Sequence, residues 1–242
     1  MTRGPLHNQT DTFASEIVDL LTSTLDGVGR EIDLIARQRE DDQARSVTLR
    51  TDENRPVTAH VNGRPLLRLD LSYQLELTND GKYLRTTRSS FQVRGMVPRR
   101  EPFFRYDFLA SPRSKTVPTA HLQVYGHRDD LLHAMYISNR AKSKPSRRKD
   151  LDPSSPRGVG MIHFPVGGTR FRPCLEDILE LIINEFGVDT VDGWQEALTT
   201  GRIAWRHLQL ASAVRDDPET ARNALNELDR GRSTNEEGLG RY

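Results

Sequence analysis

The clearest pattern along the chain is a strict alternation of apolar and polar residues between Arg68 and Leu77. Apolar side chains occupy every second position and therefore share one face of an extended strand. One apolar and one polar face are typical of an antiparallel sheet that is covered on one side only. The pair Asn62-Gly63, which accepts positive φ, precedes this segment and predicts a tight hairpin turn.

Further strands are predicted by the same alternation or by short apolar runs: residues 57–61, 64–67, 82–94, 103–109 and 121–125. In the segment 82–94 we expect Tyr83, Phe91 and Val93 to face the core. Residues 31–36 alternate imperfectly, so strand and helix both remain open there. We prefer a hairpin in which they pair with residues 45–49.

Apolar residues at helical spacing predict helices on both sides of the strand-rich segment. The expected helices are residues 11–25, 127–139, 173–186, 194–214 and 218–228. Asp217 is the expected N-cap of the last helix. The helix over 194–214 could be broken near Thr200-Gly201, since glycine weakens a helix interior.

Helices and strands grouped in separate runs predict an α+β fold, with an N-terminal helix, an antiparallel sheet of about six or seven strands, and C-terminal helices packed on the sheet. We expect a single domain over residues 11–230, since the C-terminal helices carry apolar faces that need the sheet. Residues 1–10 and 231–242 are expected to be disordered. Residues 140–160, rich in Lys, Arg, Ser and Pro, are expected to form a mobile basic loop.

Composition narrows the classes of protein. The 242 residues include 35 Lys and Arg against 34 Asp and Glu, so affinity for nucleic acid would require a local basic patch. The single cysteine, Cys174, excludes an internal disulfide and a multi-cysteine zinc site, and we interpret it as a small buried residue. No apolar run is long enough for a membrane span, and the N-terminus lacks a signal-peptide core, so we expect a cytoplasmic protein without a cofactor.

Ionisable groups within apolar strands are the main functional signal, because such groups are rarely buried without partners. Arg105 and Asp107 share one face of their strand, and His121, Gln123 and Tyr125 share one face of the next. If these strands pair, the two polar rows lie side by side. They then either satisfy each other as a structural network or converge on a site.

A metal-independent ribonuclease needs a base, an acid and cations that stabilise a charged phosphorane. His121 is the leading base or acid, with His163 or His127 as its partner and Asp107 as the group that orients a histidine or an arginine. The catalytic candidates are His121, His163, His127 and Asp107, and the phosphate-binding candidates are Arg105, Tyr125, Arg170 and Arg172. Arg202 and Trp205-Arg206 could hold nucleic-acid bases, or the tryptophan could be a core anchor.

Segments between Phe104 and Ile182, namely Arg-Tyr-Asp, His-Leu-Gln-Val and His-Phe-Pro followed by Arg-Phe-Arg-Pro-Cys-Leu-Glu-Asp, resemble an uncharacterised family of actinobacterial proteins. In layout the region is distantly similar to TumE-type toxins of toxin–antitoxin pairs. The resemblance implies an RNA-directed or toxin-like role.

Two functions remain open from the sequence. One is a phosphate- or RNA-recognising protein, as a toxin-like ribonuclease or as a binding protein for RNA or a nucleotide. The other is a non-enzymatic interaction or regulatory protein, such as a component of a defence or toxin–antitoxin module. In this second case the polar strand residues form a structural network, and the C-terminal helices contact a protein partner. A metal-dependent hydrolase would require His121, His127 and Asp107 to meet at one point.

Overall fold

The computed structural model describes residues 5–28, 34–38, 46–52, 56–78, 81–96, 102–112, 117–125, 164–166 and 172–232. In chain order its elements are α1 (Pro5–Thr24), β1 (Leu34–Gln38), β2 (Ser46–Thr51), β3 (Val57–Val61), β4 (Arg64–Leu77), β5 (Leu84–Gly95), β6 (Phe104–Leu109), β7 (Ala120–Val124), β8 (Phe164–Pro165), α5 (Leu175–Phe186), α6 (Trp194–Asp216) and α7 (Pro218–Arg232). The predicted α+β fold is confirmed.

The sheet is antiparallel at every pairing, in the order β1-β2-β4-β5-β6-β7-β8, with β3 also paired to β4. The pairing of β1 with β2 confirms the hairpin preferred for this region. Asn62 and Gly63 both have positive φ, at 51° and 71°, and join β3 to β4 in the predicted tight turn. β4 is one long strand, whereas the sequence suggested two separate ones.

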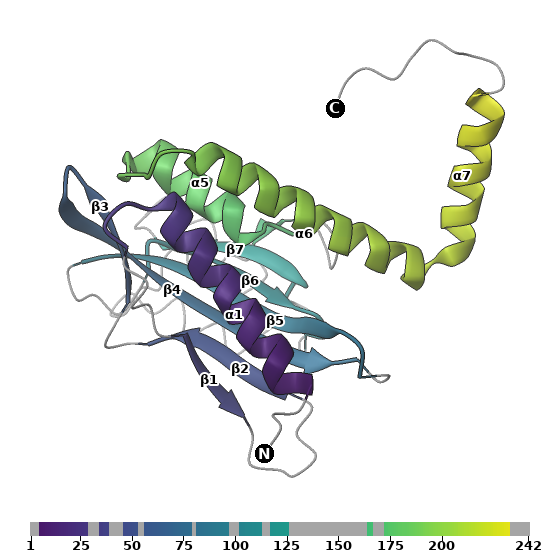
Figure 1. Cartoon of the computed structure of the whole chain (residues 1–242), viewed down its shortest axis with the longest axis horizontal. Coiled ribbons are helices and arrows are strands. Elements are labelled where there is room, and N and C mark those ends of the chain that lie inside the picture. Colours follow the sequence, from purple (N-terminus) through teal and green to yellow (C-terminus); the bar gives the residue numbers. More distant parts are fainter. Residues whose placement is uncertain are drawn as a thin grey trace, which may run out of the picture.

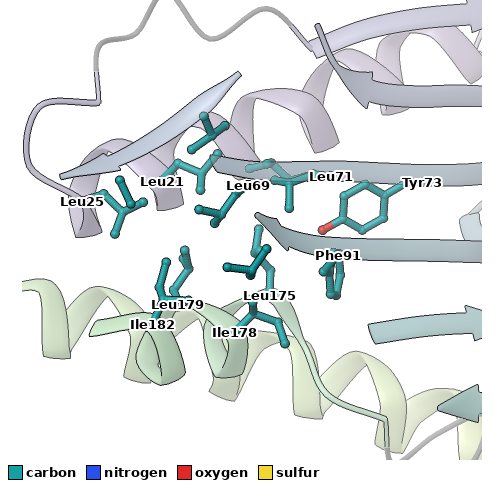
Figure 2. Packing of buried hydrophobic residues seen from close by; sticks show 14 of the residues in the cluster. Leu21, Leu25, Leu69, Leu71, Tyr73, Phe91, Leu175, Ile178, Leu179 and Ile182 are labelled. Carbon is teal, nitrogen blue, oxygen red and sulfur yellow. The ribbon is translucent and has the colours of Figure 1, made fainter. Parts of the chain in front are cut away.

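Helices α1 and α5 cover the same face of the sheet (Figure 1). The alternating residues of β4 point into the core between them, where leucines of α1 meet leucines and isoleucines of α5 (Figure 2). Tyr73 packs edge-on against Phe13 of α1 and against Phe91 of β5, with ring centroids 5.1 and 5.5 Å apart. The face of β4–β7 that the helices cover is therefore apolar, and the reverse face is polar.

Local signals explain where α5 begins and ends. Asp177 reaches back to the backbone N–H of Cys174 at 3.0 Å, so the first turn satisfies one of its free donors. Gly187 ends the helix with a left-handed φ of 65°, and its N–H donates to the carbonyl of Ile183. The helix is displaced by two residues from the predicted start at Pro173, because Cys174 is the N-cap.

Several sequence predictions need correction. α1 begins at Pro5, so residues 5–10 are helical and not disordered, and Leu6 and Thr10 are buried. Tyr83, which was expected to face the core, is 53% exposed. α7 extends to Arg232, past the predicted end of the last helix, although its Asp217 cap is as expected, accepting from Thr220 N at 3.1 Å. The predicted helix over 127–139, the basic loop over 140–160 and the tail from 233 lie outside the described residues.

Asp189 connects three parts of the fold. Its carboxylate accepts the backbone N–H groups of Asn62 at 2.9 Å and of Gly63 at 2.7 Å. Its own N–H donates to the carbonyl of His60, and its carbonyl accepts from Asp26 at the end of α1. Asp189, three residues past the end of α5, thus fixes the β3–β4 hairpin against the end of α1.

We predict that Asp189→Ala lowers the melting temperature in a pH-dependent manner. The two backbone N–H donors, from Gly63 and Asn62, hold the pKa of Asp189 below its ordinary value of 3.8. A carboxyl with a lowered folded-state pKa stabilises the fold above its unfolded pKa, and this stabilisation is lost as the pH falls through the folded value. Thermal melts from neutral to acidic pH should therefore show a gap that closes at the acidic end. Asp192→Ala, in the same loop, should show no such gap, and a pH-independent gap for Asp189→Ala would contradict the prediction.

Gly201 explains why α6 continues through the predicted break. A Cβ at this position would lie 3.1 Å from Cγ of the buried Glu176, so the absence of a side chain allows α6 to pass close to α5. The glycine therefore permits close helix packing and does not end the helix.

We predict that Gly201→Ala destabilises the protein by about 1–3 kcal/mol, since the added methyl group overpacks the α5–α6 contact. Alanine would otherwise stabilise a helix by about 1 kcal/mol relative to glycine. Ala204→Gly at an exposed position of the same helix measures this propensity effect alone. Urea unfolding of the variants tests the prediction, which is wrong if Gly201→Ala is more stable than the wild type.

Candidate functional site

The pairing of β6 with β7 brings the predicted polar rows together. Arg105 lies opposite Gln123, and Asp107 lies opposite His121. On the other side of β6, Ser90 of β5 lies opposite Asp107. These side chains occupy the reverse face of the sheet, away from α1 and α5, because their neighbours Tyr106 and Leu122 are in register with the core residue Phe91. The predicted side-by-side arrangement is therefore confirmed.

Asp107 is the centre of this cluster, and it is only 9% exposed. Its carboxylate accepts a hydrogen bond from Ser90 Oγ at 2.7 Å and forms an ion pair with Arg105 Nε at 2.9 Å. Nε2 of His121 lies 3.6 Å from the same carboxylate. Arg105 Nε also donates to Gln123 Oε1 at 2.6 Å, so the guanidinium joins the two rows.

The network continues across β5 to β4. Arg94 Nη2 donates to Gln92 Oε1 at 2.6 Å, and Arg94 Nε donates to Asp70 Oδ2 at 2.7 Å. Arg68 Nε donates to the other oxygen of Asp70 at 2.8 Å. Gln92 Nε2 in turn lies 3.4 Å from Ser90 Oγ. A continuous row of hydrogen bonds and ion pairs therefore crosses four strands, and we call it the polar ladder.

His121 lies beside Asp107 of this ladder and is buried, with 2% of its surface exposed. Its Nδ1 lies 3.0 Å from the carbonyl oxygen of Pro118. Because a carbonyl oxygen only accepts, Nδ1 carries the hydrogen in this contact, which leaves Nε2 directed toward Asp107. A general base must come within hydrogen-bond reach of its substrate, and a ring in this position is not open to solvent. This half of the predicted site has the geometry of a structural network.

Of the remaining predicted site residues, the structure describes Arg172 and Tyr125. Arg172 lies on the helix-covered face, with its guanidinium carbon 3.8 Å from the ring centroid of Phe108 and 5.9 Å from that of Trp205. Tyr125 follows the end of β7, and its backbone N–H donates to the carbonyl of Phe103. His127, His163 and Arg170 lie outside the described residues. Arg105 and Arg172, which were expected to hold one phosphate, are thus on opposite faces of the sheet.

Arg172 borders a hollow of about 380 Å³ between the start of α5 and the middle of α6. We call it the arginine–tryptophan hollow, and its lining residues are Val166, Arg172, Pro173, Cys174, Asp177, Arg202, Trp205 and Arg206. Trp205 and Arg206 lie three and four residues after Arg202 along α6, so the three side chains share a face of the helix. This spacing is the signal by which the hollow could have been found from the sequence.

Two of the arginines in the hollow, Arg202 and Arg206, differ in whether they form ion pairs. Arg202 forms ion pairs with Asp177, at 2.8 Å, and with Glu180. Burial raises the pKa of Asp177, but hydrogen bonds from Arg202 and Cys174 outweigh this effect and the net pKa is lowered. Asp177 is therefore an ionised partner of Arg202, whereas Arg206 is exposed and has no hydrogen bond or ion pair with any described residue.

Cys174 is the only thiol in the hollow, and it is buried, as the sequence suggested. Burial raises its pKa, and the nearby carboxylate of Glu176 raises it further. The neutral thiol is a poor nucleophile, because the thiolate is the reactive form. Cys174 thus serves as an N-cap residue and a packing residue.

Comparisons with known proteins give no match: no family model, no curated protein and no solved structure is similar to this chain. The likeness to actinobacterial proteins and to TumE-type toxins stays a prediction. Within the described ranges, no group of three His, Cys, Asp or Glu side chains is arranged to hold a metal ion. No helix in those ranges is long and apolar enough to cross a membrane.

We predict that Asp107→Ala destabilises the protein by about 2–4 kcal/mol, because it leaves Arg105, Ser90 and His121 without their shared acceptor in a buried setting. Asp70→Ala, on the same ladder but more exposed, should cost about 1 kcal/mol. Chemical denaturation of both variants gives the comparison. Equal losses, or no loss for Asp107→Ala, would contradict the structural role of the ladder.

Proposed function

We propose that the protein binds RNA or a nucleotide in the arginine–tryptophan hollow and does so without cleaving it. The observation that carries the proposal is the position of Arg172, over the ring of Phe108 and within 5.9 Å of the Trp205 ring centroid, at the edge of a hollow that also contains Arg206. An aromatic ring holds a guanidinium in a fixed orientation, and an oriented guanidinium is a common element of phosphate-binding sites.

Size and chemistry both favour a nucleotide. A hollow of about 380 Å³ lies within the range of small-ligand sites. An indole offers a surface on which any base can stack, and arginines nearby can neutralise the phosphate. The chain as a whole has a net charge of +1, so attraction of a nucleic acid requires a local basic group, and these arginines are such a group.

The positions of the described proton-transfer groups favour binding without cleavage. Among the described residues, the hollow is lined by one carboxylate, Asp177, whose lowered pKa makes it a weak base, and by one thiol, whose pKa is raised. His121, the expected base, belongs to the polar ladder on the opposite face. The ribonuclease interpretation therefore receives no support from these groups, whereas the ladder favours the alternative in which the polar strand residues are structural.

We predict that Trp205→Ala raises the dissociation constant for a short single-stranded RNA about 5- to 100-fold, the usual worth of one base–aromatic stack. Arg206→Gln should weaken binding about 5-fold and reduce the salt dependence by about one counterion. Fluorescence anisotropy with a labelled oligoribonucleotide at several salt concentrations measures both effects. A nucleoside monophosphate should compete for the site.

Arg215→Gln is the matched control, since it removes one exposed arginine from the same helix, where Arg215 lies over Tyr83 and outside the hollow. Its affinity should stay within about twofold of the wild type. If Arg215→Gln and Arg206→Gln weaken binding equally, attraction is due to general charge and the hollow is not the site. An absence of RNA binding at low salt would reject the proposal.

A further inference from the structure

Asp177 is the one carboxylate among the described residues that line the arginine–tryptophan hollow. Its side chain is 43% exposed, so a ligand in the hollow can reach it. Burial raises the pKa of this carboxyl, but hydrogen bonds from Arg202 and Cys174 outweigh burial, so Asp177 is ionised at neutral pH. An ionised carboxylate accepts hydrogen bonds and donates none. The hollow therefore holds a charged acceptor beside its arginines.

Within the described part of the chain, this carboxylate has one acceptor position left for a ligand. Its two oxygens offer about four lone-pair positions. Oδ1 accepts from Arg202 Nε at 2.8 Å, and Oδ2 accepts from the backbone N–H of Cys174 at 3.0 Å and from the Cys174 thiol at 3.3 Å. Two donors thus occupy Oδ2, whereas Oδ1 has a single donor. A ligand that carries a suitably placed donor gains a charge-assisted hydrogen bond at Oδ1.

The ribose is the part of a nucleotide that suits this acceptor. A phosphodiester carries no donor and is repelled by the carboxylate, so Asp177 adds nothing to the binding of phosphate alone. Ribose lies between base and phosphate, and carboxylates are the usual acceptors of ribose hydroxyls in dinucleotide sites. When a base stacks on Trp205 and Arg206 binds the phosphate, the ribose is left to face Asp177. The carboxylate is held there by Arg202, which shares the helix face of Trp205 and Arg206.

We propose that Oδ1 of Asp177 accepts a hydrogen bond from the 2′-hydroxyl of the bound nucleotide and makes the hollow selective for ribose over deoxyribose. The 3′ oxygen is esterified within an RNA strand, so the 2′-hydroxyl is the ribose donor that a strand and a free nucleotide share. It is also the group that distinguishes RNA from DNA. This inference rests on the proposed function, because it assigns the sugar of the ligand in the same hollow.

Isothermal titration calorimetry of the full chain with adenosine 5′-monophosphate and with its 2′-deoxy analogue tests the proposal. We expect the wild type to bind the ribonucleotide about 5- to 30-fold more tightly, as a hydrogen bond to a charged acceptor at a partly exposed position would give. Short oligoadenylates of ribose and of deoxyribose should show the same order of affinity.

Two variants assign the selectivity to one carboxylate. Asp177→Ala should bring the ratio of the two dissociation constants to within about twofold of one, while the affinity for the deoxynucleotide stays equal or rises, because a negative charge is removed. Glu180→Ala is the matched control, since it also removes a carboxylate that pairs with Arg202 but does not line the hollow. Its ratio should equal that of the wild type.

A general loss of affinity cancels in these ratios, because both nucleotides are measured on each variant. Asp177→Asn keeps the size of the side chain and an acceptor for the N–H of Cys174, so it replaces Asp177→Ala if that variant does not fold. Its ratio should also fall, because a neutral acceptor is weaker than a charged one.

The outcomes separate this inference from the proposed function. Equal affinity of the wild type for both nucleotides, or a ribose preference that Asp177→Ala retains, would overturn the role of Asp177 and leave nucleotide binding in place. Tighter binding of guanosine 5′-monophosphate without a difference between the two sugars would assign the acceptor to a base and also overturn the inference. An absence of binding by every nucleotide and oligoadenylate would reject the proposed function together with it.

Discussion

The alternation of side chains along β4 to β7 is the constraint on which the rest of the structure depends. Because neighbours on a strand point to opposite faces, each leucine or aromatic residue that enters the core directs a polar neighbour to the reverse face. One pattern therefore has two consequences. It forms the apolar core, which lies between the sheet and helices α1 and α5, and it forms the polar ladder on the reverse face. A shift of register by one residue would expose the core leucines and bury Asp107 among them.

The same alternation also places two groups of charged and aromatic side chains on opposite faces of the sheet. Asp107, His121 and Arg105 partner one another on the reverse face, where the charges satisfy each other. Arg172 and Trp205 lie on the helix-covered face, where a hollow remains between α5 and α6. We infer that the buried cluster contributes to stability, and we propose that the hollow offers cations and an aromatic surface to a ligand.

The sequence predicted the elements with strong local signals. The period of two in β4, the Asn62-Gly63 turn and the Gly187 helix end are each determined by a few neighbouring residues, and the structure has all three. Interpretation of Gly201 as a break was wrong, because its role depends on Glu176 of another helix, which a local pattern does not contain. The alternation along one strand correctly predicted that Arg105 and Asp107 share a face, because this depends on neighbouring residues alone. The location of Arg172 could not be predicted in this way, because it depends on how the chain returns to the sheet.

The measurement that separates the two faces most directly is side-chain NMR of the wild-type protein during titration with a nucleoside monophosphate. We expect the indole resonance of Trp205 to shift with saturation, while the imidazole resonances of the enclosed His121 stay unchanged. A shift of His121 without a change at Trp205 would contradict the proposed division and return the ligand site to the polar ladder.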